Sequence, residues 1–303
     1  MKGSEARARY SAWAEKARES HRKGNLARVL ACYRSALRVA QKTGEESLRL
    51  RATCDVSGAL IELGRYREAE AGLREIILHA GDARAAWQAT FNLAIALRRQ
   101  GLIDRAWQFA KRAVDTARRL RSKNTLARSL NLVGNLHLIQ SRFAEALDCY
   151  RQALKLYAAC PGDFRLPVSV IRDNLGYCLL LKERFEEGLE QIDAALQMAQ
   201  EIGQPRATAE CLQDRCYGLM RLKRFEEAEA SGRRALELAE RHGYREMIVN
   251  CYYLLGEIRH LRNDDAGRDE FFLKLQALYP HLPFLRDFLC AFDVSGIINL
   301  KSL

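Results

Sequence analysis

Variants of one stretch recur along most of the sequence: Ser141-Arg142-Phe143-Ala144-Glu145-Ala146-Leu147-Asp148-Cys149-Tyr150-Arg151-Gln152-Ala153. Close copies are Glu183-Arg184-Phe185-Glu186-Glu187-Gly188 and Lys223-Arg224-Phe225-Glu226-Glu227-Ala228. With Ala146 as the anchor, the matching positions are Val29, Ala69, Ala106, Ala146, Gly188, Ala228 and Ala266. The steps between them are 40, 37, 40, 42, 40 and 38 residues. A period of this size indicates an array of stacked supersecondary units.

Each unit is predicted to be a pair of helices. Phe143, Ala146, Leu147 and Tyr150 follow the i, i+3, i+4, i+7 spacing of one helical face. The short turn before Phe143 forces the two helices of a unit to lie antiparallel. The expected pairs are 5–22 with 26–43, 47–63 with 66–80, 83–100 with 103–120, a fourth unit around 126–157, 166–181 with 185–202, 206–222 with 225–241, and 245–261 with 266–278.

The end of the chain departs from the repeat. After Pro280, an apolar stripe over residues 285–292 predicts one more helix, and residues 294–300 form a short apolar tail. The last repeat of a solenoid exposes an apolar face that needs a cover. We therefore divide the chain into repeats over residues 1–280, and a capping helix with an apolar tail over residues 281–303.

The charge is concentrated in the first two-fifths of the chain. Residues 1–121 hold 25 Lys and Arg against 13 Asp and Glu, a balance of +12, whereas the remainder holds 24 against 25. This asymmetry suggests an acidic partner or weak attraction to nucleic acid, or it reflects only the solvated outer faces of helices rich in arginine.

The composition favours a cytoplasmic protein. The sequence has no run of 18 apolar residues and its start is polar, so we expect neither a membrane span nor a signal peptide. Nine scattered cysteines, most within apolar helical patterns, indicate free buried thiols in a reducing compartment.

The sequence contains little that could carry out catalysis. Six dispersed histidines form no metal-binding spacing, and no glycine-rich phosphate loop follows a strand. We therefore expect no enzymatic activity, no metal site and no cofactor.

The paired helices, with Gly134 in the first and Ala146, Tyr150 and Ala153 in the second, resemble tetratricopeptide repeats. Units of about 40 residues are longer than the usual 34 and resemble the long-helix subclass of this family. The resemblance implies an all-α, right-handed solenoid of about seven helix pairs with a C-terminal capping helix. It also implies that the first helix of each pair lines an inner face that binds peptides or proteins.

Polar and aromatic residues recur on these first helices. Asn and Asp are poor helix formers, so their repeated use within helices suggests a role in binding. A ladder of amides satisfies the donors and acceptors of an extended peptide, and tyrosines or arginines add selectivity. The alternative is that these residues are merely hydrated in a wide groove. The predicted groove residues are Asn92, Arg98, Arg128, Asn131, Asn135, Asp173, Asn174, Tyr177, Gln213, Asp214 and Tyr217.

The function that we predict is non-catalytic binding of a protein or peptide, by a scaffold or regulator that is a monomer or homodimer. The first alternative is a regulator whose basic N-terminal repeats bind nucleic acid or an acidic protein. Of these two ligands, nucleic acid is the one that we do not expect. A more remote alternative is an accessory subunit of an enzyme.

Overall fold

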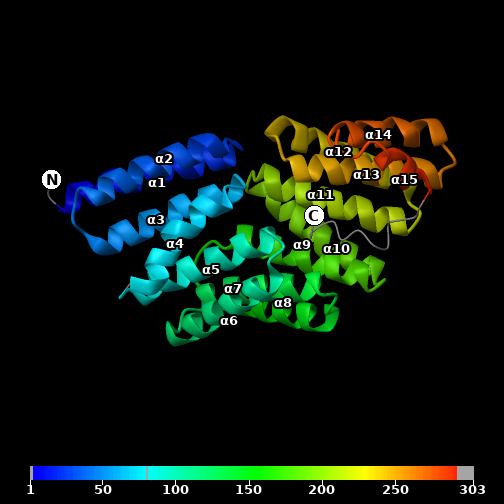
Figure 1. Ribbon diagram of the computed structural model, residues 1–303. Helices are drawn as coiled ribbons and strands as arrows, with labels where there is room; N and C mark the ends of the chain where they lie inside the picture. The colour runs from blue at the N-terminus through cyan, green and yellow to red at the C-terminus, as the bar shows by residue number, and fades with distance from the viewer. Residues whose placement is uncertain (1–2, 80, 292–303) are drawn as a thin grey trace. The chain divides into compact units, whose positions relative to one another are not determined.

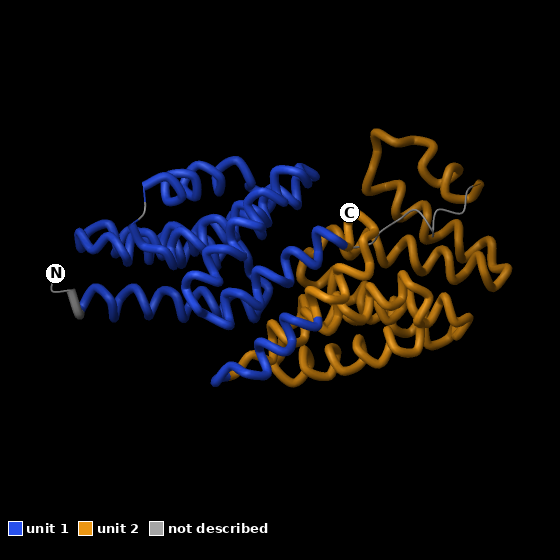
Figure 2. The backbone as a smooth tube through the Cα atoms, turned by 90° about the horizontal axis from the view of Figure 1, so that it is seen from below, with its two compact units in different colours: residues 1–137, 151–162 blue, residues 138–150, 163–303 orange. Residues whose placement is uncertain are grey.

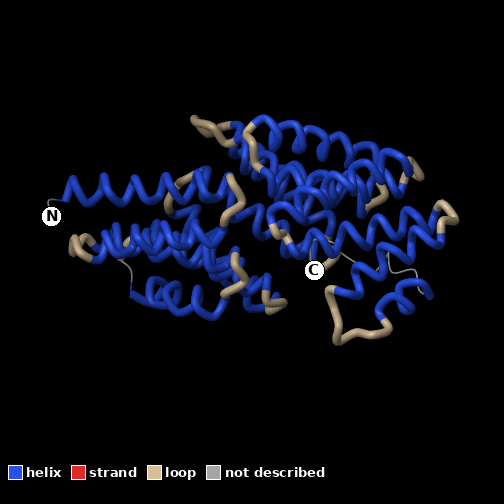
Figure 3. Tube along the Cα trace, turned by 90° about the horizontal axis from the view of Figure 1, so that it is seen from above, coloured by secondary structure: helices blue, strands red, loops and turns tan. Residues whose placement is uncertain are grey.

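The computed structural model describes residues 3–79 and 81–291, and within them the regular structure is entirely helical (Figures 1 and 3). The helices come in chain order as seven consecutive pairs and one more helix, which confirms the predicted all-α class. They are α1 (Gly3–Arg22), α2 (Leu26–Gln41), α3 (Glu46–Glu62), α4 (Tyr66–His79), α5 (Ala83–Arg99), α6 (Ile103–Arg119), α7 (Lys123–Ile139), α8 (Phe143–Ala158), α9 (Arg165–Leu181), α10 (Phe185–Glu201), α11 (Pro205–Arg221), α12 (Phe225–His242), α13 (Arg245–Leu261), α14 (Asp265–Ala277) and α15 (Leu285–Ala291).

The chain folds as two compact units, coloured separately in Figure 2. Unit 1 comprises residues 1–137 and 151–162, and unit 2 comprises residues 138–150 and 163–303. In unit 1, α3 packs against α4 and also directly against α5. In unit 2, α11 packs against α12 and directly against α9 and α13. Within each unit, these first helices therefore contact one another, as well as the second helix of their own pair.

The turn inside each pair has the same backbone conformation. Two residues before the second helix begins, φ is positive in all seven pairs, whether or not the residue is glycine. These residues are Gly24, Gly64, Gly101, Ser141, Glu183, Lys223 and Asn263, with φ between 57° and 74°. A left-handed residue at this point reverses the chain within very few residues, so the two helices of a pair are joined tightly.

The helices of one pair approach closely where glycines face each other. A Cβ atom added to Gly188 on α10 would lie 2.9 Å from the Gly176 carbonyl oxygen and 2.6 Å from a Leu180 methyl carbon. A Cβ added to Gly176 on α9 would lie 2.7 Å from the Gly188 carbonyl oxygen. The two backbones are therefore in contact across this pair, where most other units have alanine at the anchor position.

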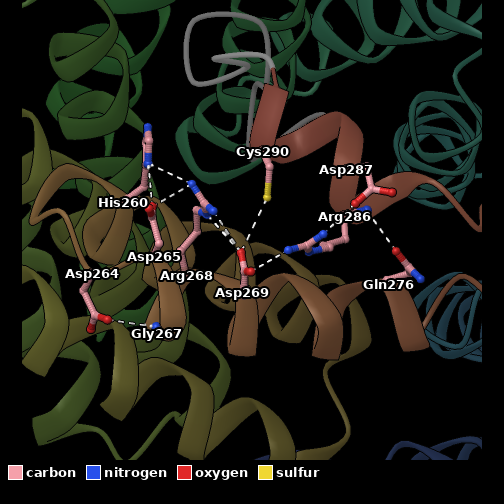
Figure 4. A network of polar contacts seen from close by, with 10 residues as sticks. All are labelled: His260, Asp264, Asp265, Gly267, Arg268, Asp269, Gln276, Arg286, Asp287 and Cys290. Carbon is pink, nitrogen blue, oxygen red and sulfur yellow. Dashed lines mark hydrogen bonds and ion pairs between the residues drawn. The ribbon is translucent and has the colours of Figure 1, made fainter.

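The last helix, α15, is attached to α14 by polar contacts around one carboxylate (Figure 4). Asp269 on α14 forms ion pairs with Arg268 and with Arg286, and the Cys290 thiol lies 3.7 Å from its Oδ1. The Arg286 backbone N–H also donates to Gln276 Oε1 at 3.0 Å. A helix thus follows the seventh pair as predicted, whereas the apolar tail predicted at 294–300 lies outside the described residues.

Candidate functional site

The predicted groove residues of unit 1 lie on α5 and α7. Arg98, Arg128, Asn131 and Asn135 are half-buried, so part of each side chain reaches solvent. Asn92 is only 7% exposed, and its Nδ2 donates to the Cys54 carbonyl oxygen on α3 at 3.1 Å. Asn92 therefore links two successive first helices, and the other four form the accessible part of this set.

Arg128 on α7 lies over two aromatic rings of α5. Its guanidinium carbon is 5.1 Å from the centre of the Trp87 ring and 4.8 Å from that of Phe91. The two rings are themselves stacked, with centres 5.4 Å apart. The face of an aromatic ring carries partial negative charge, so it attracts the positively charged guanidinium group of Arg128.

Trp87, one of the two rings beneath Arg128, is buried and hydrogen-bonded. Trp87 is 2% exposed, and its indole Nε1–H donates to Ser129 Oγ at 2.9 Å. Ser129 in turn donates to the Thr125 carbonyl oxygen at 2.8 Å. Because Trp87 and Phe91 are one helical turn apart on α5, the sequence places them on one face. It does not show that Arg128, 41 residues after Trp87, covers them.

The predicted groove residues of unit 2 are buried. They lie on α9 and α11 and are at most 6% exposed. They are Asp173 at 3%, Asn174 at 6%, Tyr177 at 0%, Gln213 at 4%, Asp214 at 0% and Tyr217 at 4%. In the described conformation these side chains are part of the interior, where a ligand would reach them only after the helices separate.

Several of these buried groups bond to one another across the stack of first helices. Asn250 Nδ2 on α13 donates to Gln213 Oε1 at 3.2 Å, and Gln213 Nε2 donates to Asp214 Oδ1 at 3.4 Å. The Tyr177 and Tyr217 rings are 6.0 Å apart, and Arg221 donates to the Tyr217 hydroxyl at 2.9 Å. Amides and tyrosines at repeating positions thus hold successive helices of unit 2 in register.

The cysteines of the described chain are free thiols, most of them buried. Burial, with smaller effects of the neighbouring Glu240 and Asp214, raises the pKa of Cys251 to about 12. Burial likewise raises the pKa of Cys54 to about 12. Such thiols stay protonated near neutral pH and have little nucleophilic character.

A cavity of about 280 Å³ lies in unit 1, lined by residues of α6, α7 and α8. Its lining consists of the apolar side chains of Leu126, Leu130 and Leu156 and the polar side chains of Arg118, Gln152 and Lys155. Within residues 3–79 and 81–291, His, Cys, Asp and Glu form no cluster that could hold a metal ion. None of the helices in these residues is long and apolar enough to cross a membrane.

Residues 84–159 match the family model described as tetratricopeptide repeat, and this segment includes α7 and all of α5 but its first residue. No curated protein matches the chain in sequence.

Solved structures with the same fold cover nearly the whole chain. The Rap conjugation gene regulator of the plasmid pLS20, in complex with the Phr* peptide, has a TM-score of 0.70 at 16% identity, over 94% of this chain and 76% of its own. A Rap protein complexed with competence and sporulation factor has a TM-score of 0.59 at 11% identity, over 95% of this chain and 99% of its own. A tetratricopeptide repeat protein from Parabacteroides merdae has a TM-score of 0.53 at 13% identity, over 93% of this chain and 98% of its own.

Proposed function

Since the chain is a tetratricopeptide-repeat protein, we propose that it acts without catalysis, as a scaffold or regulator that binds a peptide or partner protein on its first helices. The binding face that we propose is the accessible set of unit 1, Arg98 on α5 with Arg128, Asn131 and Asn135 on α7. We place the protein in the cytoplasm, as a monomer or a homodimer.

One contrast carries this proposal: Asn131 and Asn135 on α7 are half-buried, whereas the residues at the same repeat positions in unit 2 are buried. Those residues are Asp173 and Gln213, and Tyr177 and Tyr217. Asn131 and Asn135 are four residues apart, so they lie on one face of α7, and both remain partly accessible. A side-chain amide offers both donors and acceptors, which suits the main chain of an extended peptide of any sequence. The set in unit 2 is buried, so the partly accessible set of unit 1 is the better binding face.

The structural neighbours support the proposal through their ligands. Two proteins of the same fold are known in complex with the Phr* peptide and with competence and sporulation factor. The identities of 16% and 11% carry over the fold alone, so the ligand of this chain is inferred from its own residues.

A second candidate function rests on the charge of the first 121 residues. A balance of +12 there favours an acidic partner over a basic one. An acidic peptide or protein fits both the charge and the amide face, whereas nucleic acid fits the charge alone.

The test is selection of peptides from a random display library on the full-length protein, followed by affinity measurements on two variants. We expect the double change Asn131→Ala and Asn135→Ala to weaken a selected peptide by roughly 5- to 30-fold, because each amide loses its hydrogen bonds to the ligand. The matched control is Gln108→Ala, an exposed amide on α6, which should bind as the wild type does.

Thermal unfolding of each variant separates lost binding from lost folding. If no peptide is enriched, or if enriched peptides bind the double variant unchanged, this face does not have the function proposed.

A further inference from the structure

The cavity of unit 1 lies on a different side of α7 from the proposed binding face. Leu126 and Leu130 on α7 line it, and Arg128 stands midway between them in sequence. Because an α-helix has about 3.6 residues per turn, Leu126 and Leu130 share one side of α7 and Arg128 lies on the other. We call this cavity the α6–α8 pocket, and its lining residues are Arg118, Leu126, Leu130, Gln152, Lys155 and Leu156.

The apolar part of the lining is partly open to solvent. Leu130 is 9% exposed, whereas Leu126 and Leu156 are half-buried. When an apolar group of a ligand enters, these leucines lose their contact with water, and this favours binding. A volume of about 280 Å³ lies just below the roughly 300–1,000 Å³ of sites that hold a whole small-molecule ligand. The α6–α8 pocket therefore suits a single large apolar side chain.

The polar part of the lining carries positive charge. Arg118 on α6 and Lys155 on α8 are both exposed. Arg118 approaches Asp115 at 3.7 Å, but the two side chains are 65% and 66% exposed, and such pairs contribute little. Among residues 3–79 and 81–291, no carboxylate lies within ion-pair distance of the Lys155 ammonium. Both cations are therefore accessible to the anionic groups of a ligand.

The positive charge continues around the α6–α8 pocket. Residues 118–126 and 151–158, which supply most of the lining, hold six Lys and Arg and no Asp or Glu. The six are Arg118, Arg119, Arg121, Lys123, Arg151 and Lys155. Such a concentration attracts an acidic segment and disfavours a basic one.

Hydrogen bonds hold the wall of the pocket in place. Tyr157, next to Leu156, is 3% exposed, and its hydroxyl donates to Asn124 Oδ1 at 3.1 Å. Lys123 Nζ donates to the Ala159 carbonyl oxygen at 3.3 Å. Both bonds join the end of α8 to the beginning of α7. A site formed before the ligand arrives loses less conformational freedom on binding.

We propose that the α6–α8 pocket is a docking site for an acidic segment of a partner protein. It receives one large apolar side chain as an anchor, and Arg118 and Lys155 bind carboxylates that flank this anchor. The inference goes beyond the proposed function, because it places a second site on another side of α7. Nucleic acid has no flexible apolar side chain to fill a recess. A membrane surface binds apolar side chains that project from a protein, whereas these leucines line a recess.

The experiment follows leucine methyl groups by NMR in the isotope-labelled full-length protein, with signals assigned from Leu126→Ile and Leu156→Ile. Three acetylated and amidated peptides are titrated: Asp-Glu-Phe-Glu-Asp, the neutral Asn-Gln-Phe-Gln-Asn, and Asp-Glu-Ala-Glu-Asp, which lacks the anchor. We expect saturable shifts of both leucines with the first peptide. Each of the other two should bind at least roughly 10-fold more weakly, because one loses charge-assisted hydrogen bonds and the other loses apolar burial. Octanoate and vesicles of phosphatidylglycerol are the probes for a fatty acid and for a membrane surface.

Two double variants with the same change of net charge tie the binding to the pocket. Arg118→Glu with Lys155→Glu should weaken the first peptide roughly 10- to 100-fold, the effect of losing hydrogen bonds between charged groups. Arg105→Glu with Arg112→Glu, at exposed positions of α6 outside the lining, is the matched control. It should weaken the peptide at most about twofold, because salt screens distant exposed charges. All four positions are exposed, so thermal unfolding should be unchanged in both variants.

Several outcomes would each overturn the proposal: no shift of Leu126 and Leu156 with any peptide, equal binding of the acidic and neutral peptides, or an equal loss in the two double variants. Shifts of these leucines with octanoate or vesicles alone would overturn it too. Asn131→Ala with Asn135→Ala should leave the binding of the first peptide unchanged. If the pocket fails these tests while display-selected peptides still require Asn131 and Asn135, the inference fails and the proposed function stands. If the pocket binds as expected but display selection yields no such peptide, the reverse holds.

Discussion

At the scale of the residue, the repeated turn tolerates side chains that favour other conformations. Lys223 has φ = 59°, in the left-handed region, and its side chain is exposed. An L-residue in this region costs roughly 1–2 kcal/mol because Cβ crowds the following carbonyl oxygen. Three of the seven pairs relieve this cost with glycine at the same position, namely Gly24, Gly64 and Gly101.

We therefore predict that Lys223→Gly stabilises the protein. The gain should be about 0.5–1 kcal/mol, since glycine relieves the crowding but also gives the unfolded chain more conformational freedom. The measurement is the urea midpoint of unfolding. Lys223→Ala, which keeps Cβ and removes the charge, is the control and should leave the midpoint unchanged. A glycine variant no more stable than the alanine variant would show that this turn is not strained.

At the scale of the element, the backbones of α9 and α10 approach each other more closely than the repeat pattern implies. Most units have alanine at the anchor, so the sequence alone suggests that Gly188→Ala is harmless. In the structure the added methyl group would lie 2.9 Å from the Gly176 carbonyl oxygen, on the backbone of the facing helix. We predict that Gly188→Ala lowers the free energy of unfolding by about 1–3 kcal/mol, the usual effect of overpacking.

Gly58→Ala on α3 provides a control of opposite sign. A Cβ at Gly58 would meet only Asn92 Nδ2, at 3.9 Å, so the space is available. Alanine there should stabilise α3 by about 0.5–1 kcal/mol through helix propensity. Urea unfolding of both variants measures the two effects, and an equal response would mean that the close approach of α9 and α10 has no energetic consequence.

At the scale of the whole molecule, the positive charge concentrated in residues 1–121 leaves two acidic partners to compare, nucleic acid and an acidic protein. If residues 1–121 bound nucleic acid, the affinity would fall steeply with salt, because each neutralised phosphate releases counterions. Single-stranded nucleic acid also needs aromatic rings on which to stack its bases. Trp87 is buried, at 2% exposure, and Phe91 at 7%, so both are unavailable for base stacking.

We therefore predict only weak, nonspecific binding of mixed-sequence RNA and DNA at physiological salt. Fluorescence titration of labelled oligonucleotides over a range of salt concentrations measures it. Submicromolar affinity with a steep salt dependence would favour the nucleic-acid alternative instead.

The sequence by itself determined the class of fold and the position of nearly every helix. The structure has α13 at Arg245–Leu261, the predicted bounds, and the second helix of each pair beginning within a residue of its prediction. These features are local: apolar spacing within a helix, a short turn and a recurring anchor specify them without knowledge of distant contacts. The period also identified the first helices as the ones that carry recurring polar residues.

Only the tertiary structure decided which of those residues a ligand could reach. Asn135 and Tyr177 occupy equivalent positions after Gly134 and Gly176, yet Asn135 is half-buried and Tyr177 is fully buried. Burial depends on how closely neighbouring pairs pack, and this depends on side chains about 40 residues away in sequence. For the same reason, the contact of Arg128 with Trp87 and Phe91 emerges only when α5 and α7 lie side by side.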